Sequence, residues 1–486
     1  MQDRRAHQDA TGGWVSSKGS VRLEAWLFKG MLALCVLLPL PLGSDRPLAW
    51  QAAGLMVAML LIGTLFLPGD SLGGTWRNLR IPILLFAAAA LFATLQSFGL
   101  TPSGWHEAIW AKASAALGHK LDGTIAADPL AAQDYLFRLI AYGGWLLVAV
   151  VLQANPQRAK AVVATVTLCG ALYAFYGLVV YWSGNRTLLW FPKWAYGGDL
   201  TSTFVNRNSF ATYLDLTLMA GLAKLGVEIS SLKIYESRRD NLRILIEFLT
   251  NRWPVLLALC LIGTALLLTH SRGGFTAACA GVAALFIGMG AAPSIRHFDR
   301  VGLLLLPSLL LLCAVVINGE ALANRFVEDN ADGDERWQVD RLTVQAIAGH
   351  ELLGSGLGSF DSVFPRYRTQ AVESYYDRAH NDYLQTLLEL GIPAGLGLMA
   401  SVGWLAGRCI RGIRARRRHA VFPCLGLAVT VLVACHATVD FSLQIPAVTM
   451  TWLLLLGSGV AQSMSRRRSD RYSDDHVPVV QRSPGA

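Results

Sequence analysis

Twelve apolar runs, each long enough to cross a hydrocarbon layer of about 30 Å, recur along this chain of 486 residues. Backbone N–H and C=O groups find no water inside a bilayer, so a chain built from such runs folds into membrane-spanning helices. Hydrophobic residues make up 53% of the sequence and charged residues only 15%, which excludes an ordinary soluble globular protein. We therefore predict an all-α, polytopic integral membrane protein with about twelve transmembrane helices.

Polar segments separate the predicted spans, and the longest of them is residues 318–380. Residues 1–24 form a long polar lead without a small-x-small cleavage site after it, which favours a first span over a cleaved signal peptide. Trp105 and Trp110, in the loop after the third span, predict a helix at the membrane interface. Residues 465–486 are basic, then low in hydrophobicity, and are predicted to be disordered. The predicted spans are about Ala25–Leu42, Leu48–Leu67, Ile81–Phe98, Tyr135–Leu152, Ala161–Ser183, Ser209–Leu225, Trp253–Thr269, Phe275–Gly290, Val301–Ile317, Asn381–Ala406, Val421–Thr438 and Pro446–Ala461.

Lysine and arginine placement predicts which side of the membrane each loop faces, because cytoplasmic loops carry an excess of both. With both termini inside, the inner segments carry 27 of the 42 Lys and Arg residues and the outer segments carry 13. Arg138 and Lys29 lie within span ends and complete the count. We therefore predict that both termini are cytoplasmic and that the loops with Arg207, Arg272 and His380 face the outer, periplasmic side.

The segment Arg366–Gly395 joins a polar, aromatic-rich loop to an apolar helix. His380 lies at the junction, and Asn381, Gln385 and Glu389 follow at spacings of four, which places these three on one face of the helix. Glu389 lies about two turns beyond the helix start, roughly 12 Å at 1.5 Å per residue. A carboxylate this deep in a span marks either a functional site or a buried pairing.

Two arginines in short loops are the other candidate site residues. Arg207 lies between Asn206 and Asn208, and Arg272 lies in the tight turn His270–Gly274, whose two glycines allow close backbone approach. A guanidinium group is always charged and binds phosphate oxygens in a fork. The two arginines could therefore hold a diphosphate and stabilise it as it departs.

His380 is the candidate base, since an imidazole titrates near working pH and could take a proton from an attacking hydroxyl. Each of these residues also has a purely structural interpretation. An arginine at a span end commonly reaches lipid headgroups, and a histidine beside an asparagine commonly starts a helix. Glu389 could simply hydrogen-bond a neighbouring helix. The predicted common membrane side of Arg207, Arg272 and His380 is what favours a site.

More specific motifs are missing or incomplete. The chain has no GxxxxGK[ST] phosphate loop, which argues against direct ATP hydrolysis, and no HExxH motif, so we expect neither a metal nor a cofactor. The run Gly354–Ser359 lacks βαβ surroundings and predicts a flexible turn rather than a nucleotide site. Asp329, Asp332 and Asp334 resemble part of a calcium loop whose later spacing fails. Gly391–Pro393 predicts a break in the tenth span.

Composition excludes two further roles. The eight cysteines lie mostly inside apolar runs and form no CxxC pair, which predicts small core residues rather than a redox or metal site. The net charge of +9 is explained by membrane topology, so we expect no nucleic-acid partner.

At the residues singled out above, the chain resembles the O-antigen ligase and polymerase family of bacterial envelope glycosyltransferases. The resemblance covers about Thr203–Met399, whereas residues 1–200 match only as a generic run of spans. The matching segments are Phe204–Asn208, Ser271–Gly274, Gly354–Phe360, Ala379–Leu384 and Glu389–Pro393. The predicted divisions are an N-terminal cytoplasmic tail (1–24), N-terminal spans (25–200), an O-antigen ligase-like domain (201–407) that includes the periplasmic loop 318–380, C-terminal spans (408–464) and a cytoplasmic tail (465–486).

The resemblance implies a metal-independent, inverting glycosyltransferase of the bacterial inner membrane. Such an enzyme takes a glycan from undecaprenyl diphosphate on the periplasmic side and joins it to an acceptor hydroxyl. Arg207 and Arg272 would bind the diphosphate, and His380 would activate the acceptor. The acceptor would be lipid A core for a ligase, a growing polysaccharide for a polymerase, or a protein serine for an oligosaccharyltransferase. The resemblance also implies supporting roles for Asn206, Asn208, Asn381 and Glu389.

Two other classes of function stay open at this point. A lipid-linked oligosaccharide flippase would also have about twelve spans, but transporters are usually built from two related halves with short loops. This chain shows no similarity between its halves, and one outer loop of some sixty residues interrupts the second half. A structural partner in a polysaccharide export complex, without an active site, is the third possibility.

Overall fold

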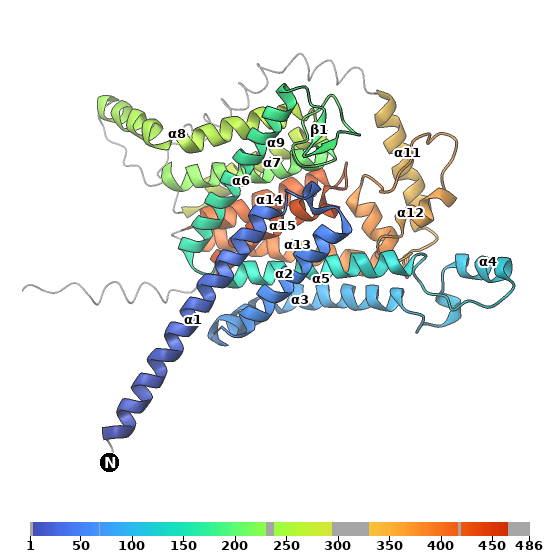
Figure 1. The fold of residues 1–486 in the computed structure, drawn as a ribbon, viewed down its shortest axis with the longest axis horizontal. Helices are drawn as coiled ribbons and strands as arrows, with labels where there is room; N and C mark the ends of the chain where they lie inside the picture. Colours follow the sequence, from blue (N-terminus) through green and yellow to red (C-terminus); the bar gives the residue numbers. More distant parts are fainter. Residues whose placement is uncertain (1–2, 68, 230–237, 294–329, 417–418, 465–486) are drawn as a thin grey trace, which may run out of the picture.

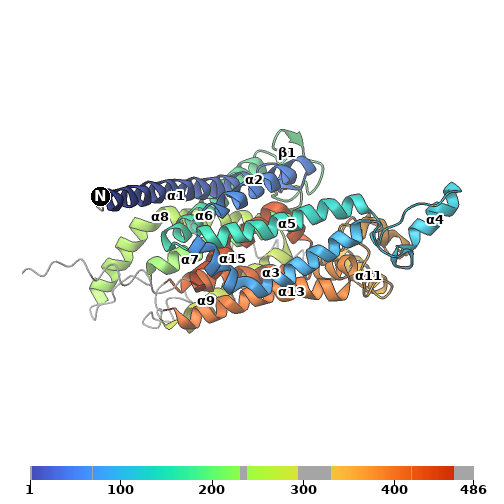
Figure 2. The ribbon, with the colours of Figure 1, turned by 90° about the horizontal axis from the view of Figure 1, so that it is seen from below.

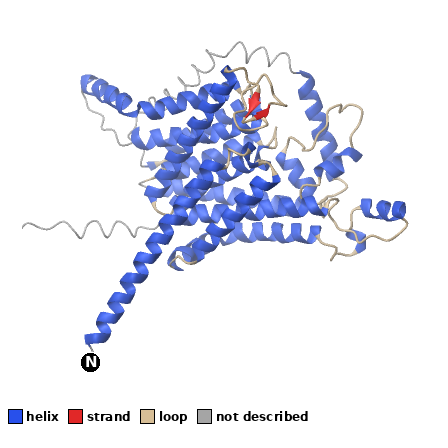
Figure 3. Ribbon diagram, viewed as in Figure 1, coloured by secondary structure: helices blue, strands red, loops and turns tan. Residues whose placement is uncertain are grey.

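Residues 3–67, 69–229, 238–293, 330–416 and 419–464 are described by the computed structural model. Figure 3 shows that helices make up most of this part, with loops between them and one small antiparallel hairpin of β1 (Thr187–Leu188) and β2 (Phe191–Pro192). The prediction of an all-α membrane protein is confirmed. The α-helices are α1 Asp3–Leu37, α2 Pro47–Leu65, α3 Gly69–Ser97, α4 Ala108–Leu117, α5 Pro129–Leu152, α6 Pro156–Trp182, α7 Arg207–Ile229, α8 Arg238–Leu268, α9 Arg272–Ala291, α11 Asn330–Ile347, α12 Phe360–Val363, α13 Asp382–Ala415, α14 Val421–His436 and α15 Pro446–Met464.

Several long helices begin at local sequence signals. Asp128 caps α5 by accepting hydrogen bonds from Leu130 N and Ala131 N, and Asn155 caps α6 by accepting one from Gln157 N. In both helices a proline follows the cap, where its missing N–H is not needed. Short polar residues thus satisfy the first backbone donors just where each apolar run starts.

Eight helices in the described part of the chain are long and apolar enough to cross a membrane. They coincide with eight of the twelve predicted spans. Three further predicted spans coincide with α1, α7 and α14, which do not meet the same limits of length, hydropathy and charge. The predicted span Val301–Ile317 lies outside the described residues. The spanning helices are Pro47–Leu65, Gly73–Ser97, Pro129–Leu152, Pro156–Trp182, Thr250–Leu268, Arg272–Ala291, Asp382–Ala415 and Pro446–Met464.

Helix ends differ from the predicted span ends because polar residues continue the helices beyond the apolar runs. The helix α1 begins at Asp3, within the segment predicted as a polar tail, and α13 continues to Ala415, past the predicted end at Ala406. Charged residues such as Lys, Arg and Glu are good helix formers. A helix can therefore be longer than the apolar run that hydropathy identifies.

The long helices lie side by side, and the connecting segments gather at one end of the bundle (Figures 1 and 2). We call this the loop end; it holds β1, β2, α4, α11 and α12, whereas the N-terminus lies at the opposite end in both views. At the centre lies α15, whose most apolar stretch is 89% buried, and it packs against α5, α13 and α14. The segment predicted as one long loop, residues 318–380, contains two α-helices, α11 and α12, in its described part.

The predicted break in α13 is confirmed at Gly391, which has φ 73° and ψ 161°. A Cβ atom here would lie 2.6 Å from Leu352 O, so only glycine fits. The amide of Ile392, released from the helix, donates to Glu351 O at 2.7 Å. The break thus brings α13 against the chain just before Gly354.

The glycine-rich run Gly354–Ser359 was predicted to be flexible, and this prediction is wrong. The turn is buried: Ser355 N donates to Leu388 O and Gly356 N to Glu389 O, both at 2.9 Å. A Cβ atom at Gly354, which has φ +63°, would lie 2.3 Å from Glu389 O. The glycines are therefore needed for close contact with α13 rather than for mobility.

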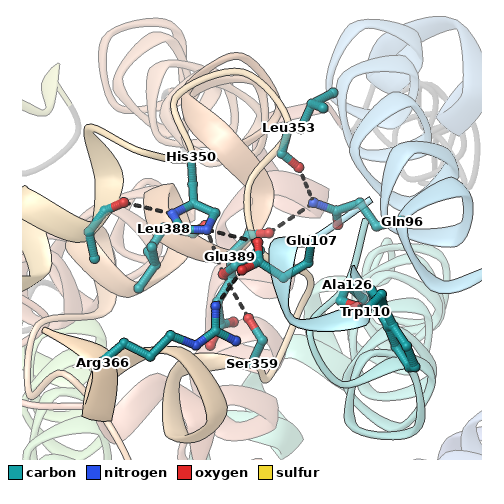
Figure 4. Close-up of polar contacts among 12 residues, drawn as sticks. Gln96, Glu107, Trp110, Ala126, His350, Leu353, Ser359, Arg366, Leu388 and Glu389 are labelled. Atoms are coloured by element: carbon teal, nitrogen blue, oxygen red, sulfur yellow. Dashed lines mark hydrogen bonds and ion pairs between the residues drawn. The ribbon is translucent and has the colours of Figure 1, made fainter. Parts of the chain in front are cut away.

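A partly exposed ion cluster attaches the loop between α3 and α5 to the segment after α11 (Figure 4). The ring of His350 contacts Glu107 Oε2 through Nε2 at 3.0 Å, and Arg366 binds the other carboxylate oxygen of Glu107. Nearby, Gln96 Nε2 donates to Leu353 O at 2.6 Å and to Glu389 O at 2.9 Å. The loop includes α4, so the predicted helix near Trp105 and Trp110 is present, and its place at the membrane interface stays a prediction.

The Glu107–His350 contact predicts a pH-dependent attachment of this loop. The hydrogen bond that the His350 ring donates to Glu107 raises the pKa of His350 above its usual value of 6.5. A raised folded-state pKa gives stability that is complete below about pH 6.5 and is lost as the pH rises through the folded value. We expect hydrogen exchange of residues 99–128, corrected for its intrinsic pH dependence, to become faster as the solution turns alkaline. The variant His350→Gln should lack this change, whereas His106→Gln, whose ring contacts Thr101 O in its own loop, should keep it.

Candidate active site

The three segments predicted to form the site all reach the loop end of the bundle. Arg207 is the first residue of α7, Arg272 is the first residue of α9, and His380 stands two residues before the start of α13. The hairpin of β1 and β2 lies at this end as well (Figures 1 and 2). Residues far apart in the sequence can therefore meet there. The contacts below describe how they meet.

Arg207 and the turn before Arg272 share one carboxylate, that of Asp199. The guanidinium NH1 of Arg207 donates to Asp199 Oδ2 at 2.8 Å, and His270 Nδ1 lies 2.9 Å from Asp199 Oδ1. The side chain of Asp199 is only 7% exposed, so water screens this pairing little. Asp199 therefore connects the start of α7 to the α8–α9 turn.

The α8–α9 turn also packs against the end of α14. Ser271 caps α9 by accepting a hydrogen bond from Gly274 N, which holds the turn in place. A Cβ atom on Gly273 would lie 3.0 Å from Val439 Cγ2 and 3.5 Å from His436 Nε2. The residue after Arg272 thus contacts the segment that leads to Asp440.

His380 faces Asp440 itself. The distance between His380 Nδ1 and Asp440 Oδ1 is 3.6 Å, longer than a hydrogen bond but short enough for an ion pair. The imidazole ring also lies edge-on to Phe441, with ring centroids 4.7 Å apart, and to Tyr376 at 5.5 Å. His380 has φ +53°, an uncommon conformation for a residue with a side chain, which its surroundings must stabilise.

Asp440 is the buried acid at the centre of this arrangement, with 1% of its surface exposed. Burial alone would raise its pKa, but His380, His436 and Arg336 outweigh burial and hold the pKa of Asp440 at about 2. The carboxylate therefore stays ionised and attracts positive charge to this part of the site.

Asp440 is expected to make the protein acid-sensitive. A lowered folded-state pKa gives stability that is present above the unfolded value, near 3.8, and is lost as the pH falls towards about 2. The loss would amount to roughly 2 kcal/mol for one such group. The apparent melting temperature of the detergent-solubilised protein should therefore fall more steeply between pH 4 and pH 2 than that of Asp440→Asn. Equal slopes would mean that Asp440 is not held ionised by its neighbours.

Tyr196 contacts Arg207 and is influenced by the charges of both Asp199 and Asp440. Its ring stacks under the Arg207 guanidinium, 5.5 Å from ring centroid to Cζ. Burial raises the pKa of Tyr196, and Asp440 raises it further while Arg207 lowers it. The Asp199 and Asp440 centres are thus close enough for one side chain to sense both.

Three of the four residues predicted to support the site accept hydrogen bonds from backbone amides through their side chains. Asn206 Oδ1 accepts from Asn208 N at 2.7 Å, and Asn381 caps α13 by accepting from Leu384 N at 3.2 Å. Glu389 accepts hydrogen bonds from Gly358 N, at 2.9 Å, and from Phe360 N and Gln385. Asn381, rather than His380, therefore caps the helix start, and Glu389 binds both the Gly354–Ser359 turn and the first residue of α12.

Sequence reasoning missed Asp199 and Asp440 and treated His270 only as part of a turn. A usable signal was present for Asp440, since it is the one acidic residue in a short apolar connection between two spans, and such residues are rare without a role. Asp199 had no comparable signal, because an aspartate in a polar loop is common. Within the described residues, no group of three or more His, Cys, Asp or Glu side chains could hold a metal ion.

Comparison with known proteins adds one match. Residues 256–399 match the family model described as O-Antigen ligase, which includes Arg272 and His380 but starts after Arg207. The resemblance predicted from residue 203 onward is therefore supported from residue 256. No curated protein matches the chain. Residues 256–399 thus match an O-antigen ligase domain, which supports the resemblance to the O-antigen ligase family.

Proposed function

We propose that this membrane protein, which carries the domain of glycosyl-transferring O-antigen ligases and polymerases, moves a glycan from undecaprenyl diphosphate to an acceptor hydroxyl. The observation that carries the proposal is the meeting of the α7 start, the α8–α9 turn and the α13 start around Asp199 and Asp440. It brings two guanidinium groups and an imidazole, each suited to one part of this reaction, to the same end of the bundle.

His380 acts as the general base in this proposal. Its Nδ1 faces Asp440, which leaves Nε2 to take the proton from the acceptor hydroxyl. The hydroxyl oxygen then attacks the anomeric carbon, and the bond from that carbon to the diphosphate oxygen breaks. A single displacement of this kind inverts the configuration at the anomeric carbon. Asp440 orients the ring and stabilises the imidazolium that forms, as a carboxylate does in other acid–histidine pairs.

Arg207 and Arg272 stabilise the leaving group. The diphosphate departs with the electron pair of the broken bond, so negative charge grows on its oxygens as the reaction proceeds. Guanidinium groups bind such oxygens in a fork and are strongest where water is excluded. Asp199 holds Arg207 at 2.8 Å, which sets the direction of its guanidinium before the donor arrives.

The loop end faces the periplasm of a bacterial inner membrane in this proposal, with both termini in the cytoplasm. The support is the two-to-one excess of Lys and Arg in the predicted inner segments. Accessibility to a membrane-impermeant thiol reagent, measured in cells with a cysteine placed at His119 in the α4 loop, tests the orientation. Labelling only after the inner membrane is permeabilised would place the loop end in the cytoplasm instead.

Reconstitution tests the function. Purified protein in proteoliposomes receives lipid-linked donor glycan in a chelating buffer, with either lipid A core or donor alone. Transfer to lipid A core is the expected result for a ligase, whereas elongation of donor without added acceptor would assign the polymerase reaction. Failure to consume donor in either mixture would contradict the transferase proposal.

A further inference from the structure

A cavity of about 450 Å³ lies between α5, α13, α14 and α15, with a contribution from α3. This volume is within the range of small-molecule binding sites. The cavity follows α13 from Asp382 to Leu405, a distance of roughly 35 Å at 1.5 Å per residue. A space of this volume stretched over such a length is slender, so a single extended chain fits it better than a compact ligand does.

The two ends of this cavity differ in chemistry. Along the inner part of α13 the lining is almost entirely apolar and includes Leu398, Met399 and Val402. Near the loop end the lining includes Asp382, Gln385 and Glu389 from α13, with Tyr135 and Arg138 from α5 facing them. A ligand that matches both ends has an apolar chain and a polar head.

Several polar atoms at the cavity are buried without a hydrogen-bond partner among the described residues. They include Nε and NH1 of Arg138, the hydroxyl of Tyr142 and Oε1 of Gln444. The Arg138 side chain is 11% exposed, and its closest ion-pair contact, to Asp45 Oδ1, is 4.0 Å long. Buried polar groups in folded proteins are nearly always hydrogen-bonded, so these N–H groups lack the acceptor that a ligand head would supply.

The cavity adjoins His380 rather than the two arginines. Asp382, which lines it, stands two residues after His380, and its amide donates to Ala437 O, another lining residue, at 2.9 Å. The lining residues come from α3, α5, α13, α14 and α15 and the segments next to them, whereas Arg207 and Arg272 begin α7 and α9. The cavity therefore belongs to the side of the site where the hydroxyl would be activated.

We propose that this cavity binds the acyl chain of a lipid acceptor, with an anionic head group at Arg138 and Tyr142. The assignment rests on the proposed function, which puts the polyprenyl diphosphate at Arg207 and Arg272 and leaves the His380 side to the other substrate. Nε and NH1 of Arg138, which have no hydrogen-bond partner among the described residues, favour phosphate or carboxylate oxygens over a neutral head. The lipid chain lies along α13, so that the hydroxyl to be glycosylated reaches His380 from the loop end.

Photo-crosslinking in proteoliposomes tests this site without any need for catalysis. Two diazirine probes are compared: a phosphatidic acid with the diazirine in its acyl chain, and farnesyl diphosphate with the diazirine in its isoprenoid chain. We expect the acyl probe to label peptides of α5 and α13. Labelling of these peptides by the farnesyl probe instead, or by neither probe, would overturn the assignment.

Two glycines of α13 provide a matched pair of filling variants. Gly403 lines the cavity and Gly407, one turn further on, does not, and a Cβ atom at either would meet nothing within 4 Å. We expect Gly403→Trp to reduce acyl labelling of α5 and α13 at least about tenfold and Gly407→Trp to leave it unchanged. Undiminished labelling of Gly403→Trp would overturn the proposal.

Further variants show whether a loss of labelling comes from a filled cavity or from misfolding, and whether labelling depends on the proposed reaction. Ala434→Trp fills the cavity from α14 and should repeat the effect of Gly403→Trp, and size-exclusion elution shows whether each variant is folded. Arg138→Gln should weaken labelling more than Arg138→Lys, since lysine keeps the positive charge. Labelling should persist in His380→Ala, so an inactive transferase can still report whether the cavity takes an acyl chain.

Discussion

Replacing His380 with alanine is expected to lower glycan transfer by at least roughly 100-fold, because a positioned general base typically contributes 10²–10⁴-fold. The 3.6 Å contact with Asp440 and the edge-on packing of Phe441 hold the ring in one orientation, so no other group can replace it without rearrangement. The measurement is the initial rate of donor consumption by purified protein in proteoliposomes. The donor Kd should change little, since the base does not bind the diphosphate.

Two further variants make the His380 result specific. His119→Ala removes an exposed histidine in the loop after α4 and should leave the rate unchanged. Asp440→Asn keeps the shape of the acid but removes its charge, so its rate should fall as well, by less than that of His380→Ala. Wild-type transfer by His380→Ala would exclude this residue as the base, and unchanged transfer by Asp440→Asn would exclude an electrostatic role for Asp440.

Replacing Arg272 with lysine is expected to lower transfer roughly 10- to 100-fold even though the charge is kept. A lysine ammonium is a point charge on a flexible chain, whereas the guanidinium presents fixed, paired donors to phosphate oxygens. Arg272 is the first residue of α9, and Ser271 fixes the turn before it, so its backbone is set before any donor binds. The loss should appear mainly in kcat, because charge on the leaving diphosphate grows in the transition state.

The same exchange at Arg207 should have a similar effect, and Arg186→Lys is the matched control. Arg186 is exposed at the β1–β2 hairpin, so its replacement should not change the rate. Asp199→Asn reports whether Arg207 must be held in place. This substitution should lower the transfer rate of the wild-type protein, but it should not lower the rate of the Arg207→Lys variant any further. Full activity of both lysine variants would contradict diphosphate binding by these arginines.

The helices of this protein were largely predictable because the signals that form them are local. Inside a bilayer each segment must satisfy its own backbone hydrogen bonds, so an apolar run such as Pro129–Leu152 becomes a helix whatever its neighbours are. The break in α13 was predictable for the same reason, since Gly391 and Pro393 act within their own turn. The turn at Gly354 was wrongly predicted to be flexible because a glycine is compatible both with a mobile turn and with a closely packed one. Only the close approach of Gly354 to Glu389 O shows that this turn is closely packed.

The candidate site was predictable in part. Arg207, Arg272 and His380 stood out because charged and titratable residues next to apolar runs are few, and the match to the O-antigen ligase family includes two of them. Asp199 and Asp440 did not stand out as their partners. Asp199 contacts a histidine 71 residues away, and no spacing rule relates residues so distant.

The sequence alone thus determined that the chain is a helical membrane protein and roughly where most of its spans lie. Only the tertiary structure decided which carboxylates meet Arg207 and His380, and that a slender cavity runs from the loop end along α13. The physical reason is that helix formation depends on neighbours along the chain, whereas a pocket or an ion pair depends on how separate helices pack against one another.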